Sequence, residues 1–368
     1  MNKFDLNIIL NIQFKSPILM NKQKKIAIVA SNNGLGHIKR SVVLANSLSR
    51  KFKVSIFCLK EKVDKFKINK NVKIINFEII KYKNIIFNKK NNIHNFFIFK
   101  NKFDIFLCDN YPEILNKQKN TIMMSNFFWH DILRINTEYY RKLEKKIAKR
   151  PVISNYLFVS KYIKKKFKVK SVGFYGKFLQ KNFDDKKKGI LISFGTAKLN
   201  YKNKIEINNF LESIKSSNNQ NIPIYLEPRF YKKNYKKFNI YEAAFDDEMY
   251  SKITVAIIKP GLGTITDCLS RGITLITYTN NQNKEFTENA KILEKNNIGI
   301  NFYNLTSALN FSMLLIKEKF ILKERFKNAK NLIWNGKKEV LKIINDLFSK
   351  KLLIYNEKYE QRLKQKKN

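Results

Sequence analysis

Short apolar runs alternate with amphipathic helical patterns from Lys24 onward, and this alternation constrains the fold more than any other feature. A first series of apolar runs covers 25–30, 53–58, 105–109, 121–125 and 156–160. A second series covers 189–194, 222–227, 253–259, 273–279 and 298–303. Strands buried on both faces of a parallel sheet have this continuously apolar character. With helical patterns such as 38–50 and 285–295 between them, the runs predict an α/β protein with two doubly wound, Rossmann-like domains.

The composition of the stretch between Gly173 and Gly189 turns polar and charged, which is typical of a linker. Met20 begins a segment that enters the first strand directly, so we interpret the residues before it as a disordered leader or a misassigned start. The expected division is a leader, a first domain, a second domain and a basic C-terminal helix or tail, at 1–23, 24–178, 186–345 and 346–368.

The net charge of +44 comes from 73 Lys and Arg against 29 Asp and Glu. Such a charge suits nucleic acid or an anionic membrane. However, 64 of the 73 are Lys and only 9 are Arg, and Asn, Ile and Phe are also abundant. Arg is the usual choice for binding phosphate, because its guanidinium group forms paired hydrogen bonds. We therefore interpret the charge mainly as the residue usage of an AT-rich genome. Peripheral association with an anionic membrane is the alternative, and a nucleic-acid partner is disfavoured.

Cysteines and hydropathy narrow the setting. The three cysteines are scattered without CxxC spacing, which excludes a disulfide framework and gives no zinc signature. No stretch reaches the roughly 18 apolar residues that a membrane-spanning helix needs. We expect a cytoplasmic protein, with the inner face of the membrane as the site of any peripheral association.

The loop at 31–37 joins the first strand to a helix. Gly34 and Gly36 allow the chain to turn tightly and to approach a ligand closely. The helix that follows offers unpaired N–H groups and a partial positive charge. The loop lacks the GxGxxG pattern, because Lys39 stands where the third glycine would be. The alternatives are a ligand-binding loop that presents His37 and a plain turn with a surface histidine.

A second glycine-containing loop, 259–267, follows the strand at 253–259. Gly261 and Gly263 permit close approach of the backbone, and Thr264 can cap the next helix, whose amides can hold a pyrophosphate. Asp267 lies one helical turn further on, where a carboxylate can accept hydrogen bonds from a ribose diol. Alternatively, Thr264 and Asp267 only stabilise the first turn of the helix.

The sequences GLGH at 34–37 and PGLGTITD at 260–267 resemble the GT-B glycosyltransferases, with the MurG-like group (glycosyltransferase family 28) as the nearest general relative. DNYP at 109–112, SNFFWHD at 125–131 and NNQNKEFTEN at 280–289 narrow the resemblance. In this order, the motifs are similar to those of glycosyltransferase-like proteins related to the N-terminal region of L-arabinokinases. The resemblance covers about residues 24–310, and no kinase domain follows it.

The resemblance implies a GT-B fold, with an acceptor domain and a nucleotide-sugar donor domain that face each other across a cleft. It implies transfer of a sugar from a donor, UDP-linked in this group, with inversion. The donor-binding residues it implies are Gly34, Gly36, Gly195, Thr196, Gly261, Gly263, Thr264, Asp267, Glu285 and Asn289. Asp267 stands where the MurG-like group has Glu, and Glu285 and Asn289 fall near its glutamine pair, so the donor sugar can differ.

On the acceptor side, His37 is the candidate base, because imidazole accepts a proton near neutral pH. Asp109 ends a strand whose exit should face the cleft, although an Asp before Pro112 can simply form a turn. His130 and Asp131 can line the acceptor site, or Asp131 can begin a helix. The chain has no DxD triplet. We therefore expect no metal and no cofactor, with helix N-termini stabilising the leaving diphosphate.

Two other classes of function remain open at this point. The same fold serves nucleotide-sugar hydrolases and 2-epimerases, which transfer no sugar to an acceptor. A non-catalytic basic protein that binds RNA or membrane is a further alternative. The acceptor itself, whether a glycan, a lipid-linked sugar or a small molecule, is not indicated.

Overall fold

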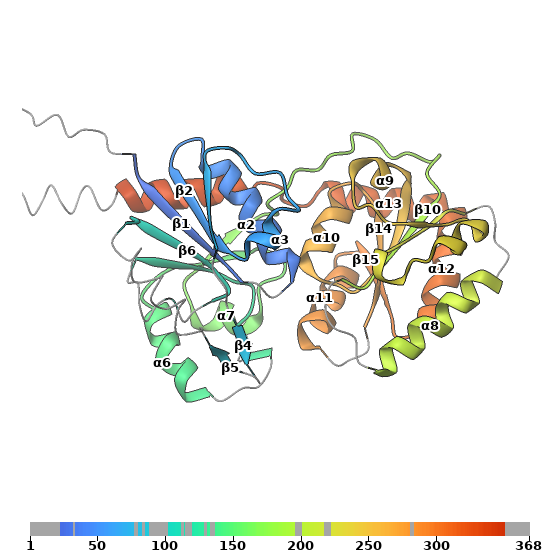
Figure 1. Ribbon diagram of the computed structural model, residues 1–368, viewed down its shortest axis with the longest axis horizontal. Helices are drawn as coiled ribbons and strands as arrows, with labels where there is room; N and C mark the ends of the chain where they lie inside the picture. The colour runs from blue at the N-terminus through green and yellow to red at the C-terminus, as the bar shows by residue number, and fades with distance from the viewer. Residues whose placement is uncertain are drawn as a thin grey trace, which may run out of the picture.

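The computed structural model describes residues 23–31, 34–76, 80–82, 85–87, 102–111, 114, 120–128, 131–132, 137–195, 201–216, 222–279 and 283–349. Within these ranges the chain forms two parallel sheets flanked by helices, which lie side by side as two lobes (Figure 1). The prediction of two doubly wound α/β domains is confirmed.

The first sheet has seven parallel strands in the order β3-β2-β1-β6-β7-β8-β9. Their bounds are β1 Lys25–Ala30, β2 Lys53–Cys58, β3 Val72–Asn76, β6 Ile105–Asp109, β7 Thr121–Met124, β8 Val152–Asn155 and β9 Val169–Val172. The helices of this lobe are α2 Leu35–Leu48, α3 Lys60–Val63, α6 Thr137–Ile147 and α7 Lys161–Lys166. A separate antiparallel pair consists of β4 Ile80–Tyr82 and β5 Ile85–Phe87. The strand order reverses between β1 and β6, which makes their carboxyl ends a topological switch point.

The second sheet repeats this plan with six parallel strands in the order β12-β11-β10-β13-β14-β15. Their bounds are β10 Gly189–Ser193, β11 Ile224–Leu226, β12 Ile240–Glu242, β13 Ile253–Ile258, β14 Thr274–Tyr278 and β15 Gly299–Phe302. The helices are α8 Tyr201–Ser216, α9 Asp247–Lys252, α10 Leu262–Leu269, α11 Lys284–Lys295, α12 Leu305–Lys317 and α13 Lys319–Lys330, with 3-10 turns at η2 Pro228–Phe230 and η3 Lys233–Phe238. The switch point here lies between β10 and β13.

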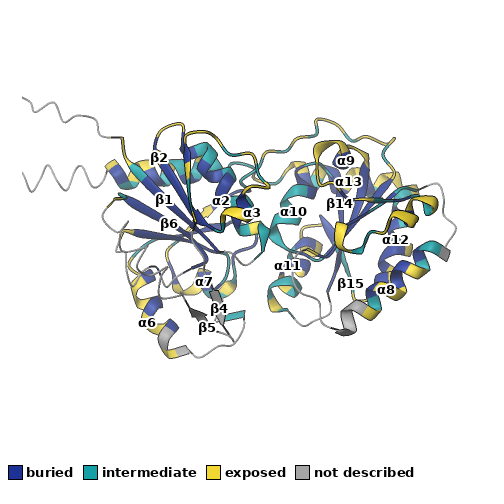
Figure 2. Ribbon diagram, in the orientation of Figure 1, coloured by how far each residue is buried: buried dark blue, intermediate teal, exposed yellow. Residues whose placement is uncertain are grey.

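The central strands are buried along their whole length, as Figure 2 shows. Every residue of β6, β10, β13 and β14 is buried. Helix α2 packs Ile38, Val42, Ala45 and Leu48 into the first core, which is the face that its sequence periodicity predicts. None of the helices in the part of the chain described is long and apolar enough to cross a membrane.

One predicted strand, 156–160, is wrong. The strand in this region is β8, and the chain turns immediately after it. The Asn155 side-chain oxygen accepts hydrogen bonds from the amides of Leu157 (3.0 Å) and Phe158 (3.2 Å). An Asn side chain that caps its own following amides in this way favours a turn over an extended strand. Phe158 and Val159 are buried and Tyr156 and Leu157 are half-buried in the turn, which explains why this sequence resembles a strand.

The chain crosses between the lobes twice. It passes from β9 to β10 through 173–188, and it returns in the helix at 336–349, which packs Val340, Ile344 and Phe348 into the first core. In Figure 1 this red helix lies on the lobe that carries the blue N-terminal strands. Residues 336–345, which the sequence analysis placed with the second domain, thus pack on the first.

Gly336 and Gly173 lie where the two crossings touch, with the Gly336 amide donating a 2.9 Å hydrogen bond to the Phe174 carbonyl. A Cβ on Gly336 would lie 2.3 Å from the Gly173 carbonyl oxygen. We therefore expect Gly336→Ala to lower the free energy of unfolding by about 1–3 kcal/mol, as overpacking does. Urea denaturation measures the change. Gly176→Ala is the control, because its Cβ would come no nearer than 3.8 Å to a neighbour. Equal stability of the two variants would contradict the packing at this crossing.

Candidate active site

The carboxyl ends of β1 and β6 bring the loop after β1 beside Asp109. The two strands pair in parallel, with Ala30 opposite Asp109 in register. Gly34 precedes α2 with a φ of 84°, a backbone conformation that glycine adopts without strain. His37 and Arg40 lie three residues apart in α2 and so share a face of the helix. The fold therefore places an imidazole and a guanidinium group over the carboxylate that ends β6.

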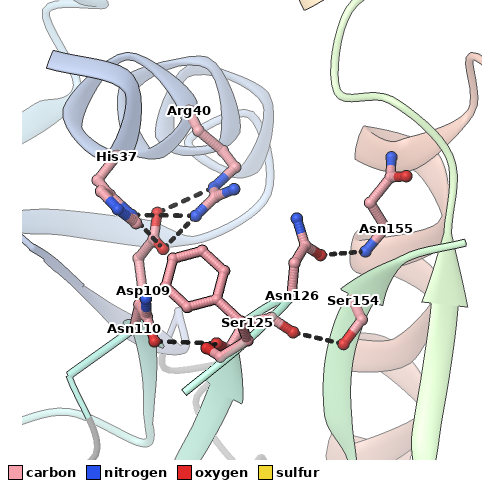
Figure 3. A network of polar contacts seen from close by, with 9 residues as sticks. His37, Arg40, Asp109, Asn110, Ser125, Asn126, Ser154 and Asn155 are labelled. Atoms are coloured by element: carbon pink, nitrogen blue, oxygen red, sulfur yellow. Dashed lines mark hydrogen bonds and ion pairs between the residues drawn. The ribbon is translucent and has the colours of Figure 1, made fainter. Parts of the chain in front are cut away.

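These three side chains form one hydrogen-bonded group (Figure 3). The Asp109 Oδ1 lies 2.9 Å from the His37 Nδ1. The Arg40 Nε donates to Oδ2 at 3.0 Å, and Arg40 also donates through Nη2 to Oδ1. Asp109 is completely buried, whereas the side chains of His37 and Arg40 are 15% and 18% exposed. The carboxylate is thus inaccessible to water, and the partly exposed imidazole and guanidinium group lie beside it.

Burial and charge act in opposite directions on Asp109. Burial by itself raises its pKa, but the charge of Arg40 and the hydrogen bonds from His37 and Arg40 outweigh burial and leave the pKa below its ordinary value. Burial likewise would lower the pKa of Arg40, and the carboxylate beside it reverses that effect and raises the pKa. The site therefore holds an ionised carboxylate and a guanidinium cation in a buried place.

The position of the proton on His37 follows from the charges around Nδ1. The Arg40 Nη2 lies 3.1 Å from the same Nδ1 that lies 2.9 Å from Asp109. Nδ1 cannot at once accept from Arg40 and donate to Asp109. Because a carboxylate is an acceptor only, the tautomer with the proton on Nδ1 pairs with Asp109 and leaves Nε2 as the nitrogen that can accept a proton.

A chain of polar contacts holds the neighbouring strand ends in place (Figure 3). The Ser125 hydroxyl donates to the Asn110 Oδ1 at 2.9 Å, and the Ser154 hydroxyl donates to the Ser125 carbonyl at 2.5 Å. The Asn155 amide donates to the Asn126 Oδ1 at 2.8 Å. These contacts join the carboxyl ends of β6, β7 and β8 beside Asp109.

Helix α10 faces α2 from the second domain. Its N-cap is Gly261, and Thr264 lies inside the first turn, so the expectation that Thr264 caps the helix is wrong. The two helices meet at glycines, because a Cβ on Gly263 would lie 3.3 Å from the Gly36 Cα. A side chain at residue 263 would therefore be tightly packed, and the neighbouring backbone would have to move by a few tenths of an ångström to accept it.

Asp267 forms an ion pair across the domain boundary. Its Oδ2 lies 2.6 Å from the Lys39 Nζ of α2. A second ion pair crosses the boundary nearby, from Lys284 at the start of α11 to Asp131, at 3.2 Å. The sequence analysis assigned Asp267 to a ribose and Asp131 to the acceptor, and in the structure each carboxylate is held by a lysine of the opposite domain.

Glu285 and Asn289 lie on α11, close to both domains. The Asn289 side chain donates to the Pro260 carbonyl at 2.9 Å and so ties α11 to the loop before α10. Burial raises the pKa of Glu285 to about 7, against the opposing charges of His37, Arg40 and Lys259. The carboxyl of Glu285 therefore interacts electrostatically with His37 of the first domain and with Lys259 of the second.

The end of β10 is closed by a carboxylate that the sequence analysis missed. Glu227, which is buried, accepts hydrogen bonds from the amides of Phe194 (2.6 Å) and Gly195 (3.1 Å). Arg229 donates to the other oxygen of Glu227. The Gly195 amide, which we expected near the donor phosphates, thus binds Glu227. The expected site residues Thr196 and His130 lie outside the described residues.

Lys259 directly follows β13 at the second switch point. Its Nζ lies 4.7 Å from the centre of the Phe286 ring. Burial lowers its pKa and the charge of Arg229 lowers it further, while Glu285 and Glu227 oppose the change. An anion bound at Lys259 would favour the charged ammonium. The described residues include no group of three or more His, Cys, Asp or Glu side chains that could hold a metal ion.

Comparison with solved structures identifies the architecture. UGT73P12 of Glycyrrhiza uralensis has a TM-score of 0.64 at 13% identity, and the match covers 94% of this chain and 100% of that one. UGT89C1 of Arabidopsis thaliana, with quercetin, has a TM-score of 0.60 at 11% identity and coverages of 88% and 99%. The spinosyn forosaminyltransferase SpnP has a TM-score of 0.56 at 10% identity and coverages of 89% and 100%.

The chain has the GT-B fold of these glycosyltransferases. No protein-family model matches the sequence, and neither does any curated protein. In this fold the first lobe carries the switch point beside His37 and Asp109, and the second lobe carries the switch point beside Lys259. Glu285 of α11 interacts electrostatically with both His37 and Lys259.

Replacing Asp109 by Asn tests the buried charge. The variant leaves Arg40 without its carboxylate, and breaking a buried ion pair costs about 3–5 kcal/mol. Because the pKa of Asp109 is lowered in the folded protein, the stabilisation by its ionised carboxylate is complete above about pH 5 and is lost as the pH falls through the folded pKa. We expect the wild type to exceed Asp109→Asn in urea stability at pH 7 and the difference to shrink below about pH 4. The exposed change Asp64→Asn is the control. A difference that does not vary with pH would refute the ionised state.

Proposed function

We propose that the protein is a glycosyltransferase that moves a sugar from a nucleotide-sugar donor, UDP-linked, to an acceptor hydroxyl. The observation that carries the proposal is the His37–Asp109 pair at one switch point, opposite the N-terminus of α10 and Lys259 at the other. Among the proteins of similar fold, UGT89C1 was solved with UDP-L-rhamnose and LpCGTa was solved with UDP. These complexes support a nucleotide-linked donor.

The acceptor domain supplies the base. With Nδ1–H donated to Asp109, Nε2 of His37 takes the proton from the acceptor hydroxyl as its oxygen attacks the anomeric carbon. The buried carboxylate compensates part of the charge that develops on the imidazole. The bond from the anomeric carbon to the diphosphate breaks on the opposite side, so the configuration inverts.

The donor domain supplies the positive potential for the leaving nucleoside diphosphate. The first-turn amides of α10 and the Lys259 ammonium lie at the same strand end, and both favour an anion. This arrangement performs the charge stabilisation without a metal ion. In this proposal, Glu285 and Asn289 on the adjoining α11 contact the donor sugar.

Asp267 is proposed to hold the ribose of the donor. Lys39 contacts only Oδ2 of this carboxylate, and an ionised carboxylate accepts about four hydrogen bonds. The ribose diol and Lys39 can therefore share it. The contacts between α2 and α10 join the two domains. Closure of the domains around the donor would exclude water and limit its hydrolysis.

His37→Gln tests the proposal. Purified protein is incubated with UDP-, TDP-, GDP- and CDP-sugars and a panel of hydroxyl acceptors, and release of nucleoside diphosphate and of free sugar is measured. We expect acceptor-dependent release, reduced in His37→Gln by about 10²–10⁴-fold, the usual contribution of a general base. Arg50→Gln, an exposed change beyond the far end of α2, should leave the rate unchanged.

Two results would argue against the proposal. Equal rates for wild type and His37→Gln would remove the base. Release of free sugar that does not depend on any acceptor would identify a nucleotide-sugar hydrolase in place of a transferase.

A further inference from the structure

Arg40 is the member of the buried group to which the proposed reaction assigns no part. Its guanidinium group reaches both oxygens of Asp109, through Nε to Oδ2 at 3.0 Å and through Nη2 to Oδ1. Two parallel N–H donors fix a carboxylate in orientation as well as in charge. A lysine could neutralise Asp109 but could not hold it in this plane.

The oxygen that Arg40 fixes is also the partner of His37. Oδ1 of Asp109 accepts from Arg40 and lies 2.9 Å from the His37 Nδ1. The orientation of the imidazole therefore depends on the guanidinium group, although both side chains come from one helix.

Arg40 also sets the charge that His37 faces. Among the described residues, charged groups that act on His37 include Asp109, Arg40 and, from α11, Glu285. Tyr175 faces Arg40 and Asp109, and burial raises the pKa of this phenol to about 12. Because Arg40 compensates Asp109, a proton taken up by His37 meets a carboxylate that is already neutralised.

We propose that Arg40 is a positioning residue, which locks Asp109 so that His37 carries its proton on Nδ1 and presents Nε2 as an exchangeable base. The inference rests on the proposed function, since it gives Arg40 a part in preparing that base. The tautomer and the titration of the His37 imidazole, on which the inference is tested, are measurable without substrate.

The first test is the tautomer in the wild type. In ¹⁵N-histidine spectra of the full chain, the His37 signals are identified by their loss in His37→Gln. We expect the neutral ring to carry its proton on Nδ1. A neutral ring protonated on Nε2, with Nδ1 accepting from Arg40, overturns the proposal, and this measurement needs no variant of Arg40.

The second test removes the guanidinium group. In Arg40→Met, Asp109 faces His37 without compensation, so the midpoint of the His37 titration should rise by about one pH unit, the usual effect of one nearby charge. Arg40→Lys should return the midpoint most of the way to the wild-type value, but it should not restore the single tautomer with the proton on Nδ1. Arg50→Met is the matched control and should change neither.

An unchanged His37 midpoint in folded Arg40→Met overturns the proposal. If Arg40→Met does not fold, Arg40→Lys decides: a wild-type midpoint together with the wild-type tautomer overturns it.

The kinetic consequence separates this inference from the proposed function. If nucleoside diphosphate release is observed, the acid limb of its pH profile should move to higher pH in Arg40→Met, because the base must be neutral to act, and kcat should fall more than KM rises. If no release is observed, the proposed function fails while the spectra still decide the role of Arg40.

Discussion

The ionised carboxylate of Asp109 lies at a position from which water is excluded, so it needs charged and hydrogen-bonding partners within the protein. The arrangement of the first domain supplies them. An isolated buried charge costs several kcal/mol, so it persists only with charged and hydrogen-bonding partners. The parallel pairing of β1 with β6 brings those partners from α2, one turn apart on one face. The same contacts orient His37, so the interaction that makes the charge tolerable also prepares the proposed base.

The domain boundary depends on a second constraint, the close approach of two glycines. Gly36 and Gly263 let the N-terminal turns of α2 and α10 come into backbone contact. Two helix N-termini that face each other both carry partial positive charge and disfavour this arrangement unless negative charge lies near. Asp267 supplies negative charge in the structure, and a nucleoside diphosphate would supply more. The polarity of the boundary is thus consistent with an anionic ligand.

The sequence predicted the parts of the site that depend on local pattern. Strand-ending loops with glycines mark both switch points, and His37 and Asp109 end in contact because parallel strands deliver their carboxyl ends to one edge. Arg40 was missed, although it is one of only nine arginines and lies one helical turn from His37. Its role depends on pairing with a residue 69 positions away, which periodicity does not reveal. Glu227 was missed for the same reason, since nothing local predicts that it binds the Gly195 amide.

The errors in the fold also have physical causes. The segment 156–160 is apolar because it is partly buried, and hydrogen bonds to Asn155 turn its backbone. Its apolar residues therefore predicted a strand where the chain forms a turn. The apolar face of the helix at 336–349 would look the same in sequence whichever domain it packed on. Only the return of the chain to the first domain, where Gly336 contacts Gly173, shows that this helix covers the first sheet.

The central claim is that the boundary beside Lys259 binds a nucleotide-sugar. It is tested most directly by thermal unfolding of the full chain with UDP, GDP, CDP, TDP and their sugars, at high salt to screen nonspecific attraction to lysine. We expect one nucleotide to stabilise the wild type by about 2.7 kcal/mol at one hundred times its Kd. Lys259→Met should lose most of this stabilisation, and Lys252→Met, an exposed lysine of the same domain, should keep it. No stabilisation by any nucleotide, or equal stabilisation of Lys259→Met, would contradict the account.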